Sequence, residues 1–304
     1  MILVALAIVA STAIGVGAER RYGERAQCWS HRSIGVLLWT VLPFVTFFVL
    51  ARLELDAGVG AGLVLAYVEL AVVGTLAYLV GSRLLGLRRE QTGALIVVVV
   101  LANTGYLGIP LCAALLGSDD LGPAIAFDTV VSGPMFYGVG FAIGAAFGTA
   151  AGDTPTERLR SFLRNPPLLA VVAALIAPDV LAPDVLVDAA EILAFAVLPV
   201  GFFILGVNLA AEAEDGAFAF PPPFSRPVAA ALGLRLAIAP ALMVGLSALT
   251  VDVPDSYLVQ AAMPSGINSL VIAHAYGLDL KITASALAWT TAIVIVAALG
   301  LSIV

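Results

Sequence analysis

The chain has 304 residues, of which 61% are hydrophobic and 12% are charged. A soluble domain carries about 25% charged residues, so the composition excludes an ordinary soluble protein and predicts an all-α membrane protein. The net charge of −7 lies in short loops, so it does not indicate a basic partner, and no nucleic-acid partner is expected. The two cysteines predict neither a disulfide nor a metal site, and no cofactor is expected.

Ten stretches of mainly apolar residues follow one another, each near the length that crosses a bilayer. The first resembles a signal peptide, but no basic residue precedes Arg20, so we expect a retained membrane helix. The sixth is short and is accepted because it pairs with the first in the repeat described below. The predicted spans are 2–18, 33–52, 57–81, 91–117, 121–149, 162–178, 186–211, 226–249, 256–276 and 280–303.

Basic residues fall on alternating loops between these spans. Only Arg52 lies on the opposite side, and Arg235 lies inside the eighth span. Because cytoplasmic loops are rich in Arg and Lys, we expect a multi-pass protein of the cell membrane with both termini outside. The residues on the basic side are Arg20, Arg21, Arg25, Arg32, Arg83, Arg88, Arg89, Arg158, Arg160, Arg164, Arg226 and Lys281.

The two halves of the chain resemble each other. VLPFVTFF from Val41 matches VLPVGFF from Val197, and ANTGYLGIPLCAALLGSD from Ala102 matches AMPSGINSLVIAHAYGLD from Ala262. With five helices in each copy, the second copy enters the membrane from the opposite side. Many secondary transporters are inverted repeats of this kind, although a duplicated scaffold without transport is an alternative. The expected units are a first repeat at 1–149, a cytoplasmic linker at 150–161 and a second repeat at 162–304.

Helix-breaking residues lie near the middle of the fourth and ninth spans. Proline cannot donate to the helical ladder, and unwound backbone inside a bilayer must be buried or line a cavity. Crossed half-helices would bring partly positive N-terminal ends, near Pro110 and Ser269, to a site for a carboxylate-sized anion. In the alternative interpretation, the two helices are only kinked and form no anion site. The predicted substrate-binding residues are Asn103, Gly105, Gly108, Pro110, Pro264, Ser265 and Asn268.

Three charged residues lie inside predicted spans, where a charge at the bilayer centre costs about 2.5–3.5 kcal/mol. Glu69 and Arg235 occupy equivalent places in the two repeats. In one hypothesis Glu69 couples proton movement and Arg235 supplies fixed positive charge for an anion. In another they form a structural ion pair, or Arg235 extends to the cytoplasmic face. Asp128 is shallow enough to reach the external interface, where a structural role is favoured.

Three motifs together resemble the auxin efflux carrier family, which includes plant PIN-type carriers and bacterial malate permeases. They are NTGYLGIPL at Asn103–Leu111, RLAIAP at Arg235–Pro240 and MPSGINSLVIAHAYGLD at Met263–Asp279. The resemblance implies a fold related to bile acid sodium symporters, with crossed broken helices 4 and 9. It also implies a scaffold of helices 1, 2, 6 and 7, a transport part formed by the other six, and transport of small organic anions such as auxin-like acids or dicarboxylates.

The leading hypothesis is therefore an organic-anion secondary transporter that works by alternating access. A sodium-coupled symporter of the same fold is the alternative, in which Asn103, Ser265, Asn268 and Glu69 supply oxygen ligands. An enzyme is not expected, because the chain has neither an HExxH pair nor a nucleophile elbow. The expected partners are a small organic anion, membrane lipid and a coupling proton or sodium ion, and a homodimer is considered.

Overall fold

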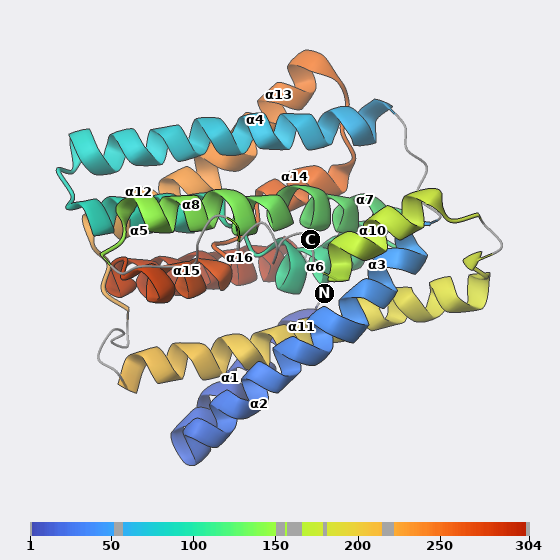
Figure 1. Ribbon diagram of the computed structural model, residues 1–304, viewed down its shortest axis with the longest axis horizontal. Helices are drawn as coiled ribbons and strands as arrows, with labels where there is room; N and C mark the ends of the chain where they lie inside the picture. The colour runs from blue at the N-terminus through green and yellow to red at the C-terminus, as the bar shows by residue number, and fades with distance from the viewer. Residues whose placement is uncertain are drawn as a thin grey trace.

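The computed structural model is helical throughout the part of the chain that it describes (Figure 1). That part comprises residues 2–51, 57–149, 156, 166–178, 181–214 and 222–301, so nearly all of the predicted linker 150–161 lies outside it. The helical segments of the first half are α1 (Ile2–Tyr22), α2 (Glu24–Val36), η1 (Leu37–Val41), α3 (Leu42–Leu50), α4 (Ala57–Leu79), η2 (Val80–Leu84), α5 (Arg89–Val100), η3 (Thr104–Gly108), α6 (Ile109–Leu116), α7 (Leu121–Ala126), η4 (Phe127–Ser132), η5 (Met135–Gly140) and α8 (Phe141–Phe147).

The second half is built in the same way, and the segments marked η are π-helical turns within longer runs of helix. One helix, α11, is continuous through Pro199, although proline removes a backbone donor. The segments are α10 (Pro166–Ile176), α11 (Asp184–Glu214), α12 (Arg226–Gly233), η7 (Leu234–Ile238), α13 (Ala239–Thr250), α14 (Asp255–Ala261), α15 (Asn268–Tyr276) and α16 (Leu280–Leu301).

Each predicted span contains a helix or a run of helical segments. Among the described residues, three runs are long and apolar enough to cross a membrane, namely Gly58–Leu84, Arg226–Thr250 and Leu280–Ala298. Large apolar side chains such as Val64 and Leu249 are exposed on the outer helices, which agrees with a bilayer as the surrounding solvent. The chain is thus a helical membrane protein, while the ten spans and their inverted arrangement remain predictions.

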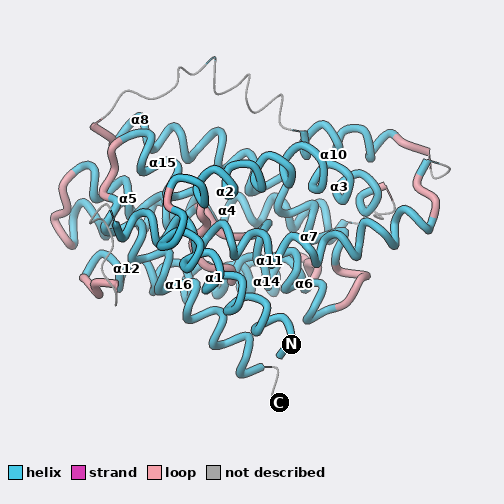
Figure 2. The backbone as a smooth tube through the Cα atoms, turned by 90° about the horizontal axis from the view of Figure 1, so that it is seen from below, coloured by secondary structure: helices cyan, strands magenta, loops and turns pink. Residues whose placement is uncertain are grey.

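The helices form two groups. In the first, α1 and α2 pack on α11, and α3 packs beside α10, as Figures 1 and 2 both show. In the second, α4 packs on α5 and α13, while α16 packs on α5, α12 and α15. This is the grouping that the family resemblance implies for a scaffold and a transport part. Helix α11 also contacts η3 and α6, so the two groups meet at the middle of the fourth predicted span.

Two glycines allow α1 and α11 to approach closely. A Cβ atom on Gly15 would lie 2.3 Å from the carbonyl oxygen of Phe203, and one on Gly206 would lie 2.2 Å from that of Thr12. Small residues at such crossings bring helix backbones into contact within a membrane. Gly15 and Gly206 therefore allow the close contact between α1 and α11.

We expect Gly15→Ala to destabilise this group, because the added methyl forces α1 and α11 apart. Overpacking of this kind costs about 1–3 kcal/mol, and thermal unfolding of the detergent-solubilised protein measures it. Gly17→Ala on the same helix is the matched control, because its Cβ would meet nothing within 4 Å. Equal melting temperatures for the two variants would contradict the close contact.

Candidate functional site

The fourth and ninth predicted helices are both interrupted, and the interruptions pair with each other. The first runs from Leu101 to Asn103, and the second from 262 to 267. The Asn103 amide donates to the Pro264 carbonyl at 2.8 Å, and the Gly266 amide donates to the Leu101 carbonyl at 2.7 Å. These bonds form one antiparallel bridge between the two segments. They satisfy backbone groups that have no water to bind inside a bilayer.

Side chains hold this pairing in place. The Ser265 hydroxyl donates to the Val98 carbonyl at 2.7 Å, and the Ser265 amide donates to Thr290 Oγ1 at 3.2 Å. A Cβ atom on Gly266 would lie 2.8 Å from the Ala102 carbonyl oxygen, so a glycine is required at this close approach. Ser265 is thus a structural part of the crossing, and its hydroxyl is already engaged with backbone.

The first interruption precedes the residues that were expected to cause it. We expected the second half-helix to start near Pro110, but helix resumes at Thr104 as the π-helical turn η3 and continues into α6. Pro110 lies within this continuous helix, directly after the π-helical turn, so it does not mark the start of the second half-helix. Gly108 has a different role, because its Cβ would lie 2.0 Å from Gln260 Oε1. In the ninth span, the second half-helix starts at Asn268, one residue before the expected Ser269.

Arg235 binds the carbonyl ends of both broken helices. Its side chain is 1% exposed. Nε donates to the Met263 carbonyl at 3.0 Å, Nη1 donates to the Val99 carbonyl at 3.0 Å, and Nη2 donates to the Ala261 carbonyl. Helix C-termini carry partial negative charge, which a guanidinium complements. Arg235 therefore does not extend to the cytoplasmic face, and three of its five N–H groups are occupied by backbone.

Glu69 is buried beside this network without joining it. Its side chain is 1% exposed, and neither carboxylate oxygen has a hydrogen-bond partner within the described part of the chain. Glu69 interacts electrostatically with Arg235, but the two form no ion pair, so the expectation of a direct pair is wrong. Burying an unpaired charge is costly, so Glu69 is a group on which a bound proton or cation has a large effect.

Asp128 belongs to η4 and lies beside Thr104, where the second half of the fourth predicted helix starts. The Thr104 hydroxyl lies 2.5 Å from Asp128 Oδ1 and 2.8 Å from Ser132 Oγ, and a Cβ on Gly105 would lie 3.2 Å from the same carboxylate. These contacts agree with the structural role favoured for Asp128, and its place relative to the external interface stays a prediction. A carboxylate beside a helix N-terminus complements the partial positive charge of that end.

Sequence reasoning missed a buried glutamine in the same place. Gln260 is fully buried, and its Nε2 donates to the Thr104 carbonyl at 3.3 Å and to the Ala124 carbonyl at 3.1 Å. Its Oε1 is buried without a hydrogen-bond partner. A glutamine inside a predicted membrane span was a usable signal. The hydroxyls of Thr104 and Ser132 were a weaker indication of a site, because single hydroxyls are common in membrane helices.

The two asparagines differ in their surroundings. Asn103 is buried at the end of the first interruption, and its side-chain amide makes no hydrogen bond within the described part of the chain. Asn268 is exposed at the first position of α15. The backbone N–H groups of Ile267 and Asn268 donate no hydrogen bond to described residues. The N-terminal end of α15 therefore binds no carboxylate among the described residues, whereas the Asp128 carboxylate lies beside the start of η3.

This arrangement has counterparts among known proteins. The family model described as "Membrane transport protein" matches residues 156–302. The match lies in the second half of the chain. The chain is also 27% identical over 276 residues to an uncharacterized transporter of Methanocaldococcus jannaschii, with 84% of this chain and 83% of the relative covered. It is 29% identical over 268 residues to an uncharacterized transporter of Methanothermobacter thermautotrophicus, with 84% and 82% covered.

These similarities confirm the family resemblance noted in the sequence. They support a membrane transporter rather than an enzyme. Both relatives align over most of their own length.

We expect Arg235→Lys to destabilise the transporter strongly, because one ammonium group cannot reach three separated carbonyls. Leaving a buried polar group unpaired costs about 1–3 kcal/mol each, so the loss should reach at least about 3 kcal/mol in thermal or denaturant unfolding. Arg226→Lys, at the exposed start of α12, is the control and should change stability by less than about 0.5 kcal/mol. A stable Arg235→Lys protein would show that the carbonyl contacts are dispensable.

Proposed function

We propose that the chain is a secondary transporter of small organic anions, such as auxin-like acids or dicarboxylates, with its substrate site at the crossing of the interrupted helices. The observation that carries this proposal is a difference between the helix ends at the crossing in the charged side chains that lie against them. Arg235 binds the carbonyl ends, and the Asp128 carboxylate lies beside the start of η3, where it accepts from the Thr104 hydroxyl. The amide end of α15, beside exposed Asn268, has no protein partner among the described residues.

A carboxylate suits this end of α15 on chemical grounds. Unpaired backbone N–H groups at a helix N-terminus bind anions, and the helix dipole adds to the attraction. The Asn268 side chain can contribute two further N–H donors, and the unpaired amide of Asn103 is on the facing segment. An anion bound here would satisfy donors that the fold leaves open.

The contact between the two helix groups supports alternating access. Tyr106 of η3 lies directly against α11, since a Cβ on Gly201 would lie 2.7 Å from Tyr106 Cβ. The crossing therefore borders the boundary between the groups. Movement of the second group against α11 would expose the site first to one side of the membrane and then to the other.

Asn103→Ala and Asn268→Ala should weaken substrate binding without unfolding the protein. A ligand that binds only the folded state raises the melting temperature, so a thermal-shift screen of auxin-like acids and dicarboxylates identifies a stabilising acid. Each variant should bind this acid about tenfold more weakly, because one charge-assisted hydrogen bond is lost. Thr250→Val, which loses only a bond to Leu246, is the control. If an acid stabilises the wild type and both asparagine variants equally, the site is elsewhere.

For coupling, we propose that Glu69 carries a proton. A proton removes the cost of a buried carboxylate without hydrogen-bond partners. The sodium-coupled alternative has its own support, because oxygen atoms of Thr104, Asp128, Ser132 and Gln260 gather at the start of η3, and cations of this kind take several oxygen ligands.

Transport into proteoliposomes separates the two forms of coupling. We expect an imposed proton gradient to stimulate uptake, and Glu69→Gln to abolish the stimulation while substrate exchange at equal pH continues. Glutamine keeps the shape and polarity of the side chain but cannot release a proton. Stimulation by a sodium gradient that survives Glu69→Gln and is lost in Asp128→Asn would instead support sodium coupling.

A further inference from the structure

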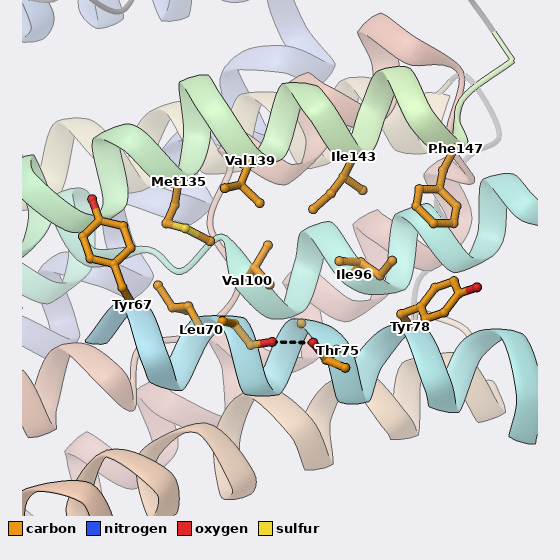
Figure 3. A pocket seen from close by; sticks show the side chains of 12 residues that line it. Tyr67, Leu70, Thr75, Tyr78, Ile96, Val100, Met135, Val139, Ile143 and Phe147 are labelled. Atoms are coloured by element: carbon orange, nitrogen blue, oxygen red, sulfur yellow. Dashed lines mark hydrogen bonds between the residues drawn. The ribbon is translucent and has the colours of Figure 1, made fainter. Parts of the chain in front are cut away.

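An open apolar groove runs along the second group of helices, on the side of α5 that faces α4 and α8. It lies between α4 on one side, α5 at its floor and η5 with α8 on the other side, and its volume is about 560 Å³ (Figure 3). Its wall is almost entirely hydrocarbon, with side chains of Ala71, Val139 and Phe147 among those that face it. Nothing in the proposed transport cycle uses this groove.

The groove has two defined ends. At one end the Tyr67 hydroxyl donates to the Val130 carbonyl at 2.6 Å, which ties α4 to η4. At the other end the rings of Tyr78 and Phe147 meet edge to face with centroids 6.1 Å apart. From Tyr67 to Tyr78 the helix rises about 16 Å. That length matches about half of the 30 Å hydrocarbon core, which is the depth that the acyl chains of one leaflet occupy.

Positive charge lies just beyond the Tyr78 end. Arg83 and Arg89 are exposed there, and neither forms an ion pair within the described part of the chain. Arg89 donates from Nε and Nη2 to the carbonyl of Ala146, the residue next to Phe147, so its guanidinium is held at the mouth of the groove with Nη1 unused.

The acidic residues near these arginines are already engaged. Glu90 pairs with Arg88 at 3.2 Å. Asp279 accepts hydrogen bonds from Gln91 Nε2 at 3.1 Å and from the Ile282 amide at 2.9 Å. Arg83 and Arg89 therefore remain as the unpaired charges at this end of the groove.

We propose that the groove and these two arginines bind one anionic phospholipid. An acyl chain lies in the groove between Tyr67 and Tyr78, and the phosphate binds Arg83 and Arg89. Aromatic residues at the level of the headgroups, followed by Arg, are the arrangement that membrane proteins place at the interface, and basic residues there attract anionic lipid. A free phosphate would satisfy the arginines but leave the apolar wall uncovered, whereas an anionic lipid satisfies both.

The test uses the full-length protein, purified in detergent and depleted of lipid. Thermal shift and native mass spectrometry are measured with phosphatidylglycerol, with phosphatidylcholine of the same acyl chains, and with inorganic phosphate. We expect phosphatidylglycerol to bind and stabilise the protein more than the other two. Because each arginine near a membrane surface contributes about fivefold, the double variant Arg83→Gln/Arg89→Gln should lower phosphatidylglycerol affinity about 25-fold.

Matched variants separate the two parts of the site. Ala71→Phe fills the groove and should reduce retention of the lipid, while Val72→Phe, which points elsewhere from the neighbouring position on α4, should not. Arg25→Gln on α2 is the charge control and should leave the affinity unchanged. All of these positions are exposed, so unchanged melting without lipid verifies folding.

Three results would overturn the proposal. They are equal stabilisation by phosphatidylglycerol and phosphatidylcholine, stabilisation by inorganic phosphate as large as that by phosphatidylglycerol, and equal lipid retention by the Ala71→Phe and Val72→Phe proteins. Substrate exchange need not be measured, so failure of the lipid site and failure of the transport proposal are distinguishable.

Discussion

An unwound helix inside a bilayer leaves amide and carbonyl groups without water, and here two such interruptions satisfy each other. The bonds Asn103–Pro264 and Gly266–Leu101 join them as a minimal antiparallel pair. Arg235 then donates hydrogen bonds to three carbonyl groups that this pairing does not use, those of Val99, Ala261 and Met263. Since an unsatisfied backbone group costs several kcal/mol in hydrocarbon, helices α5, α14 and α15 can end in the membrane interior only because these contacts exist.

The charges at the crossing follow from the same constraint. A guanidinium lies at the carbonyl ends and the Asp128 carboxylate lies at one amide end, so each compensates a helix dipole. Among the described residues, the side-chain groups at the crossing without a hydrogen bond include Glu69, the Gln260 oxygen and the Asn103 amide, and the start of α15 binds no carboxylate. We propose that a substrate or a coupling ion satisfies such groups.

Sequence patterns predicted the helices and the existence of both interruptions, because glycine, proline and asparagine within an apolar span are strong local signals. Their positions were less accurate, since the first break falls at Leu101–Asn103, whereas Pro110 lies within the helix that resumes at Thr104. The partners of Arg235 could not be predicted, because the Val99 carbonyl lies 136 residues away and belongs to backbone, which no side-chain pattern marks.

The contacts of Arg235 have a consequence for biogenesis. The guanidinium joins Val99, from the first half of the chain, to Ala261 and Met263, from the second. During synthesis the Val99 carbonyl at the end of α5 has no partner until Arg235 has been made, 136 residues later. Until then, the translocon, a lipid headgroup or water must supply a hydrogen bond to this carbonyl. Neither half of the chain, produced as a separate fragment, holds the full set of partners, so the two halves depend on each other for insertion as well as for any transport cycle.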